Sequence, residues 1–201
     1  MDLIIDYLQK CAGVFHGFVP GSVFADMVGR VEERLFARGD EDSFHTLGFC
    51  AQTLTEMRLF SRALALYLRM LADSRRPKKY IGDFYGQIGN VYFYQRQWGS
   101  ALENYQQALQ WFEKTGNHFQ LGGTYLQIGR VYEAREHITN ALSFYKTGLL
   151  ISIQNGNQDA AAYNFNSIAR IFPKLSTEQI ETLANELGEE VVQKLKESSA
   201  S

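Results

Sequence analysis

The chain of 201 residues contains a pattern that recurs after forty residues, and this recurrence limits the folds that it can adopt. The first copy reads Tyr-Gly-Gln-Ile-Gly-Asn-Val-Tyr over residues 85–92, and the second reads Tyr-Leu-Gln-Ile-Gly-Arg-Val-Tyr over residues 125–132. An Ala-Leu pair and a Tyr follow each copy at matching distances, and Gly116-Asn117 is matched by Gly156-Asn157. A fixed period of this size is typical of stacked structural repeats.

The pattern resembles the tetratricopeptide repeat (TPR) family, whose unit is a pair of antiparallel helices. A weaker copy precedes the two strong ones, and half a copy follows them. The resemblance departs from the family in lacking its closing Pro and in exceeding its usual spacing of about thirty-four residues, which implies longer second helices. The matching positions are Tyr85, Ile88, Gly89, Tyr92, Ala101 and Tyr105; Tyr125, Ile128, Gly129, Tyr132, Ala141 and Tyr145; Leu47, Cys50, Ala51, Leu54, Ala63 and Tyr67; and Phe165, Ile168, Ala169 and Phe172.

Two glycines inside the repeated pattern have a physical explanation. Gly89 and Gly129 each cost about 1 kcal/mol relative to alanine in a helix interior. A helix tolerates this cost where another backbone must come close, and Ala101 and Ala141 supply a matching small surface on the second helices. The spacing therefore predicts a close approach at both glycines.

The resemblance implies an all-α fold: a right-handed superhelical solenoid of antiparallel helix pairs, capped by helices at both ends. We expect residues 1–42 to form an N-terminal helical hairpin, with helices over 2–16 and from Ser22 to Gly39. Residues 43–172 would hold three repeats and a half. Residues 173–201 would form one capping helix, which starts at Ser176, and a tail, and all three parts would make one structural unit. The stripe of the capping helix is Ile180, Leu183, Leu187 and Val191.

Composition excludes several classes of protein. The net charge of −2 favours neither nucleic acid nor a membrane surface as a partner. Two cysteines, Cys11 and Cys50, are too few for a disulfide framework and suggest a reducing, cytoplasmic location. Asp2 and Asp6 argue against a secretory signal, and no apolar run approaches the length that spans a bilayer.

No arrangement of residues predicts catalysis, a cofactor or a metal. Glu41 with His45 and Glu133 with His137 have a spacing that can hold a metal, but neither pair has a third ligand nearby. We expect ordinary pairs on helix surfaces. The basic segment 74–79 is expected to be a solvated loop rather than a phosphate site.

The resemblance implies that first helices line a concave groove, which holds a peptide or helix from another protein. Arg130 and Arg170 lie forty residues apart, so they are expected side by side, where they would suit a carboxylate or phosphate. The alternative is that each pairs internally, for instance with Glu133. The groove residues predicted in this way are Gln52, Thr55, Glu56, Asp83, Asn90, Phe93, Tyr94, Leu126, Arg130, Glu133, Tyr163, Asn166 and Arg170.

The sequence therefore predicts a non-enzymatic interaction module, an adaptor or scaffold whose partner is another protein. Two alternatives remain open. The aromatic N-terminal hairpin would let the chain self-associate as a homodimer, or the array would sense a peptide and change its superhelical pitch.

Overall fold

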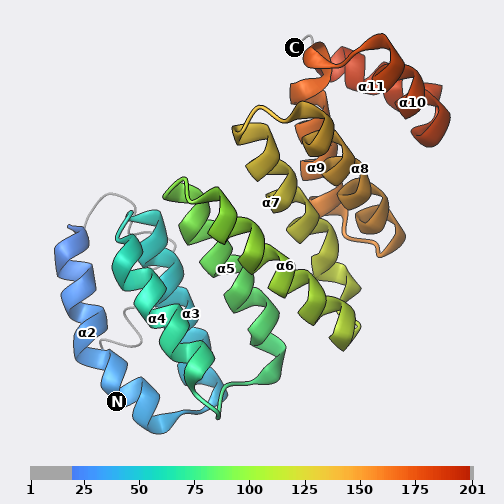
Figure 1. Cartoon of the computed structure of the whole chain (residues 1–201). Helices are drawn as coiled ribbons and strands as arrows, with labels where there is room; N and C mark the ends of the chain where they lie inside the picture. The colour runs from blue at the N-terminus through green and yellow to red at the C-terminus, as the bar shows by residue number, and fades with distance from the viewer. Residues whose placement is uncertain (1–19, 200–201) are drawn as a thin grey trace. The chain divides into compact units, whose positions relative to one another are not determined.

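The computed structural model describes residues 20–199, and the regular elements in this part of the chain are all helices (Figure 1). The all-α prediction is therefore confirmed. The first helix of the expected N-terminal hairpin, over residues 2–16, lies outside the described residues. The elements are α2 (Gly21–Arg38), α3 (Glu41–Glu56), α4 (Phe60–Ala72), η1 (Lys78–Tyr80), α5 (Ile81–Tyr94), α6 (Trp98–Thr115), η2 (His118–Gln120), α7 (Leu121–Ala134), α8 (Ile138–Gln154), α9 (Gln158–Ile171), η3 (Phe172–Lys174), α10 (Thr177–Leu187) and α11 (Glu189–Ser199).

The chain divides into two compact units, the first ending at Ala108 and the second beginning at Leu109. Each unit has its own cluster of buried apolar side chains. The sequence predicts a single unit, and it carries no linker that would signal the division, because the boundary falls inside the continuous helix α6.

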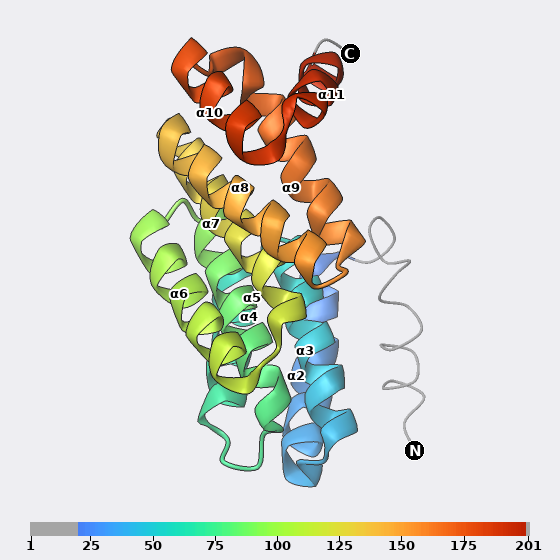
Figure 2. The ribbon, with the colours of Figure 1, turned by 90° about the vertical axis from the view of Figure 1, so that its right-hand side faces the viewer.

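In the first unit, α2 packs against α3, α3 against α4 and α4 against α5 (Figure 2). The helix expected from Ser22 to Gly39 is present as α2, which buries Phe24, Val28, Val31 and Leu35 and ends at Gly39 in the left-handed conformation. The guanidinium of Arg69 on α4 donates hydrogen bonds to Glu32 and Glu33 of α2 and lies 4.0 Å from the ring centroid of Phe36. These contacts join α2 to the first repeat.

In the second unit, α7 packs against α8, α8 against α9 and α9 against α11. The expected single capping helix is wrong, because α10 and α11 are separate helices. Gly188 between them has φ of 92°, a conformation that interrupts a helix and that glycine adopts without strain. Ser176 and Gln179 form a capping box at the start of α10, where the sequence predicts a helix start.

The turns inside the three complete repeats share one backbone conformation. Arg58, Arg96 and Glu136 have φ of 62°, 59° and 61°, and each stands two residues before the second helix of its repeat. The next residue in each turn donates a backbone hydrogen bond to the carbonyl five residues earlier, which closes the first helix. Gly116 and Gly156 adopt the same conformation between repeats, as their matched positions predict.

Gly89 and Gly129 lie at close contacts, as predicted, but the neighbour is a tyrosine ring rather than the backbone of another helix. A Cβ atom added to Gly89 would lie 2.5 Å from the ring of Tyr105, and one added to Gly129 would lie 2.5 Å from the ring of Tyr145. Both rings are fully buried. The repeated Gly and Tyr therefore form one packing unit in each strong repeat, with the aromatic ring lying flat against helix backbone.

Candidate functional site

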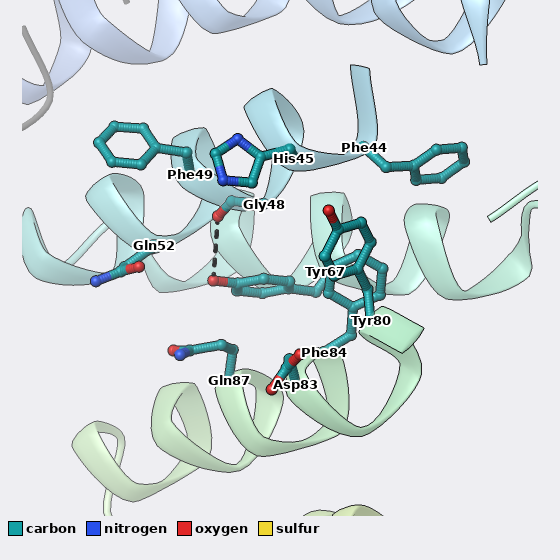
Figure 3. A pocket seen from close by; sticks show the side chains of 10 residues that line it. All are labelled: Phe44, His45, Gly48, Phe49, Gln52, Tyr67, Tyr80, Asp83, Phe84 and Gln87. Atoms are coloured by element: carbon teal, nitrogen blue, oxygen red, sulfur yellow. Dashed lines mark hydrogen bonds between the residues drawn. The ribbon is translucent and has the colours of Figure 1, made fainter. Parts of the chain in front are cut away.

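A pocket with a volume of about 180 Å³ lies between the first helices α3 and α5 of the first unit. Tyr67 reaches it from the second helix α4 (Figure 3). The described residues that line it are Phe44, His45, Gly48, Phe49, Gln52, Tyr67, Tyr80, Asp83, Phe84 and Gln87.

Helical spacing places these side chains together. On α3, His45, Gly48 and Gln52 follow one another at intervals of three and four residues, which puts them on one face of the helix. Asp83 and Gln87 repeat this spacing on α5. Gly48 has no side chain to fill the space, and its carbonyl accepts a hydrogen bond of 3.5 Å from the hydroxyl of Tyr67. Across the pocket, Gly48 faces the ring of Phe84 on α5, since a Cβ added to Gly48 would lie 3.6 Å from that ring.

Aromatic rings form most of the interior surface. The ring centroid of Phe84 lies 6.3 Å from that of Tyr67 and 6.0 Å from that of Tyr80. Phe44, Tyr67 and Phe84 are buried, whereas Phe49 and Tyr80 are half-buried and form the edges of the pocket. Such a surface offers ring faces with negative electrostatic potential to a bound group.

Asp83 is the acidic group among the described residues that line this pocket. Its side chain is half-buried, and no residue in the described part of the chain donates a hydrogen bond or ion pair to it. Burial raises the pKa of the Asp83 carboxyl, since the charged form loses water without gaining a partner. A carboxylate in this state is available to an external donor.

Only some of the groove residues predicted in the first unit line this pocket. Gln52 and Asp83 line it. Thr55 is wrong as a groove residue, because it is 5% exposed and its hydroxyl donates to the carbonyl of Ala51 in its own helix. Tyr105 donates to the side chain of Asn90, which turns that amide towards α6. The remaining predicted residues of this unit, half-buried or exposed outside the pocket, are Glu56, Phe93 and Tyr94.

In the second unit, Arg170 of α9 forms a two-point ion pair with Glu133 of α7. Its Nε and Nη2 donate to the two carboxylate oxygens over 2.9 and 2.7 Å. Glu133 also accepts a hydrogen bond of 2.5 Å from the hydroxyl of Tyr145, and Arg130 donates to Gln127 over 2.9 Å. The internal pairing given as the alternative is therefore present for Arg170.

The other predicted groove residues of this unit differ in exposure. Leu126 is wrong, because its side chain is 8% exposed and belongs to the core under α8. Tyr163 is 63% exposed, and Asn166, three residues later on α9, is also exposed.

Replacing Glu133 by Gln is expected to lower stability at neutral pH by about 1 kcal/mol, a small value because Arg170 is largely exposed. Burial raises the pKa of Glu133, but hydrogen bonds from Arg170 and Tyr145 lower it more, so the pKa lies below its ordinary value. The carboxylate therefore stabilises the fold above the ordinary Glu pKa, and this contribution is lost as pH falls through the lowered value.

Urea unfolding of the wild type and of Glu133→Gln between pH 7 and pH 3 measures this effect. The two free energies of unfolding should converge as the pH falls. A difference that stays constant over this range would mean that the pair contributes through packing rather than charge.

The sequence did not predict most of the residues that line the pocket. Gln87 could have been found, because it lies four residues after Asp83 on the same helix face. Tyr67 and Phe84 could not, since their patterns indicate only core positions. The depth of the pocket depends on three helices meeting, which spacing in one helix does not reveal.

The remaining charged clusters of the described part serve the fold. Arg75 donates to Asp73 and to the carbonyl of Phe36, and Arg76 donates to the carbonyl of Asp73. Lys79 pairs with Glu41. Within residues 20–199, no three His, Cys, Asp or Glu side chains are grouped so that they would hold a metal. No helix in the same range is both long and apolar enough to cross a bilayer.

Residues 80–152 match the family model described as Tetratricopeptide repeat. The match covers the second and third repeats and supports the assignment to the TPR family that the resemblance predicts. Members of the family are generally protein–protein interaction modules. A comparison with curated proteins finds no match.

Proposed function

We propose that this chain is a non-enzymatic adaptor or scaffold that binds a segment of another protein on its first helices. The pocket between α3 and α5 would be its principal contact. The observation that carries this proposal is the position of the pocket. It opens between the first helices of successive repeats, where the resemblance to the TPR family implies that the partner binds. Two of the predicted groove residues, Gln52 and Asp83, line it. The proposal includes the cytoplasmic location that the sequence predicts.

The polar rim of the pocket supports a peptide as the occupant. Gln52 is exposed and its amide nitrogen donates to Glu56, whereas Gln87 is half-buried and its amide oxygen accepts from Asn90. The oxygen of Gln52 can still accept from a peptide backbone, and the NH₂ group of Gln87 can still donate to one. A buried aromatic interior with a polar rim is the usual composition of a protein interface. Side chains of the partner would fill the interior, and its backbone would contact the rim.

A random dodecapeptide display library, selected on the full chain, tests this proposal. We expect enriched peptides to bind the wild type and to lose at least about tenfold in affinity for a variant carrying Gln52→Trp and Gln87→Trp, which obstruct the pocket. The matched control carries Gln106→Trp and Gln107→Trp, two exposed positions on α6. Circular dichroism establishes that both variants keep their helicity.

Two results would contradict the proposal. One is the absence of any enriched peptide. The other is a set of peptides that bind the obstructed variant as tightly as the control, which would locate binding elsewhere on the chain.

A further inference from the structure

The carboxylate of Asp83 accepts no hydrogen bond and forms no ion pair within the described residues. Burying part of a charged group without a partner is unfavourable. The repeat does not require an acid here, because the corresponding residues of the first, third and fourth repeats are His45, Gly123 and Tyr163. Asp83 lies in the first turn of α5, where an acid suits the helix dipole, but it accepts no backbone hydrogen bond.

The surroundings of Asp83 favour a positive charge. Ring faces of Phe and Tyr attract a cation that lies within about 6 Å of the ring centroid. None of the described residues that line the pocket is Lys or Arg. Lys79, the neighbour of Tyr80 in the chain, is paired with Glu41 and lies 5.0 Å from the Tyr80 ring centroid outside the lining. Among the described residues that line it, the pocket therefore combines one acid and several rings with no Lys or Arg, and its basic side chain is the imidazole of His45.

The volume of the pocket limits the occupant. About 180 Å³ equals roughly six times the ~30 Å³ that one water occupies in the liquid. This space accepts one side chain and no larger folded element. Figure 3 shows Gln52 on α3 and Gln87 on α5 at the same end of the pocket as the hydroxyl of Tyr67, with Asp83 on the α5 side.

We propose that the pocket receives a single basic side chain, arginine in first place, from the protein segment that binds the first helices. This inference rests on the proposed function and names the chemistry of the partner. The guanidinium would pair with the Asp83 carboxylate and stack on the rings of Tyr80 and Phe84. Arginine is favoured over lysine because its guanidinium is planar, weakly hydrated and able to donate two parallel hydrogen bonds to a carboxylate.

The sequence alone suggested an acidic anchor, held by Arg130 and Arg170. The structure weakens the basis for that anchor, since Glu133 already neutralises Arg170 over two hydrogen bonds. Charge complementarity in the first unit instead indicates a basic partner. The tests must therefore be able to detect binding of an acidic peptide as well as of a basic one.

The first test uses N-acetyl-L-arginine amide and its uncharged analogue N-acetyl-L-citrulline amide as probes in two-dimensional NMR of the full chain. The arginine compound should shift the amide signals of Gly48, Asp83 and Gln87 in a saturable manner, and the citrulline compound should bind at least about tenfold more weakly. Asp83→Asn should abolish this preference. Asp159→Asn, an exposed acid in the first turn of α9, should leave it unchanged.

The variant itself is expected to fold. Because the Asp83 carboxylate has no partner in the described part of the chain, Asp83→Asn should melt at the wild-type temperature or above it. Equal shifts with both compounds, or a preference that survives in Asp83→Asn, would overturn the inference.

The second test uses the peptides enriched from the display library. One position in them should be Arg or Lys, and replacing that residue by citrulline should lower affinity at least about tenfold. If the peptides need an unobstructed pocket but tolerate citrulline, or carry acids instead, the basic anchor is refuted while the proposed function stands. If they ignore Gln52→Trp with Gln87→Trp, the proposed function itself fails.

Discussion

Replacing Gly129 by alanine is expected to destabilise the second unit by about 1–3 kcal/mol, although alanine is the better helix former. The new methyl group would lie 2.5 Å from the ring of Tyr145. That ring has no room to move, because it is fully buried and its hydroxyl is bonded to Glu133. Gly129→Leu should cost more, since a larger side chain enters the same closed space.

Gly123→Ala in the same helix is the matched control. An added Cβ there meets nothing within 4 Å, so the change should stabilise the unit by up to about 1 kcal/mol through helix propensity. Urea unfolding of both variants measures the difference. Effects of equal sign and size at the two glycines would mean that the repeat register described above is incorrect.

The second large effect is expected at the end of the chain. Leu195 of α11 is fully buried in the core that α8 and α9 also form. Leu195→Ala removes these contacts and leaves a cavity, which typically costs about 2–5 kcal/mol. The loss would expose the apolar surface of α9, so the variant should also aggregate more readily on heating.

Lys196→Ala, at the exposed neighbouring position, is the control for Leu195→Ala. Thermal unfolding followed by circular dichroism, with light scattering recorded in parallel, separates stability from aggregation. An unchanged melting temperature for Leu195→Ala would show that α11 does not cap the second unit.

The helix pairs could be predicted from the sequence, and so could the positions Gly89 and Gly129 where a side chain has no room. Gly89 and Gly129 recur with Tyr105 and Tyr145 at constant spacing, and a helix is a local structure whose faces follow from spacing alone. The start of one helix at Ser176 and the end of another at Gly39 could also be predicted, because capping depends on a few neighbouring residues.

Features that depend on several elements could not be predicted. Arg58, Arg96 and Glu136 adopt the left-handed backbone conformation that usually requires glycine. Because none of them is glycine, the sequence does not predict this conformation in the turns. Thr55 and Leu126 seemed to face a groove, but side chains of neighbouring helices cover them.

The candidate site was predictable only through Gln52 and Asp83. Its aromatic interior comes from α3, α4 and η1 with α5, and a single helix pattern cannot reveal such a meeting of elements.

The buried tyrosines provide each unit with its own optical reporter. Burial raises the pKa of Tyr67 in the first unit, and burial together with the bond to Glu133 raises that of Tyr145 in the second. Opening of either unit would return its phenol to the ordinary tyrosine pKa of about 10. Alkaline ultraviolet titration, with Tyr67→Phe and Tyr145→Phe as references, would thus record the order in which the two units open. A helix that runs through their boundary, as α6 does, raises the question of whether they open together.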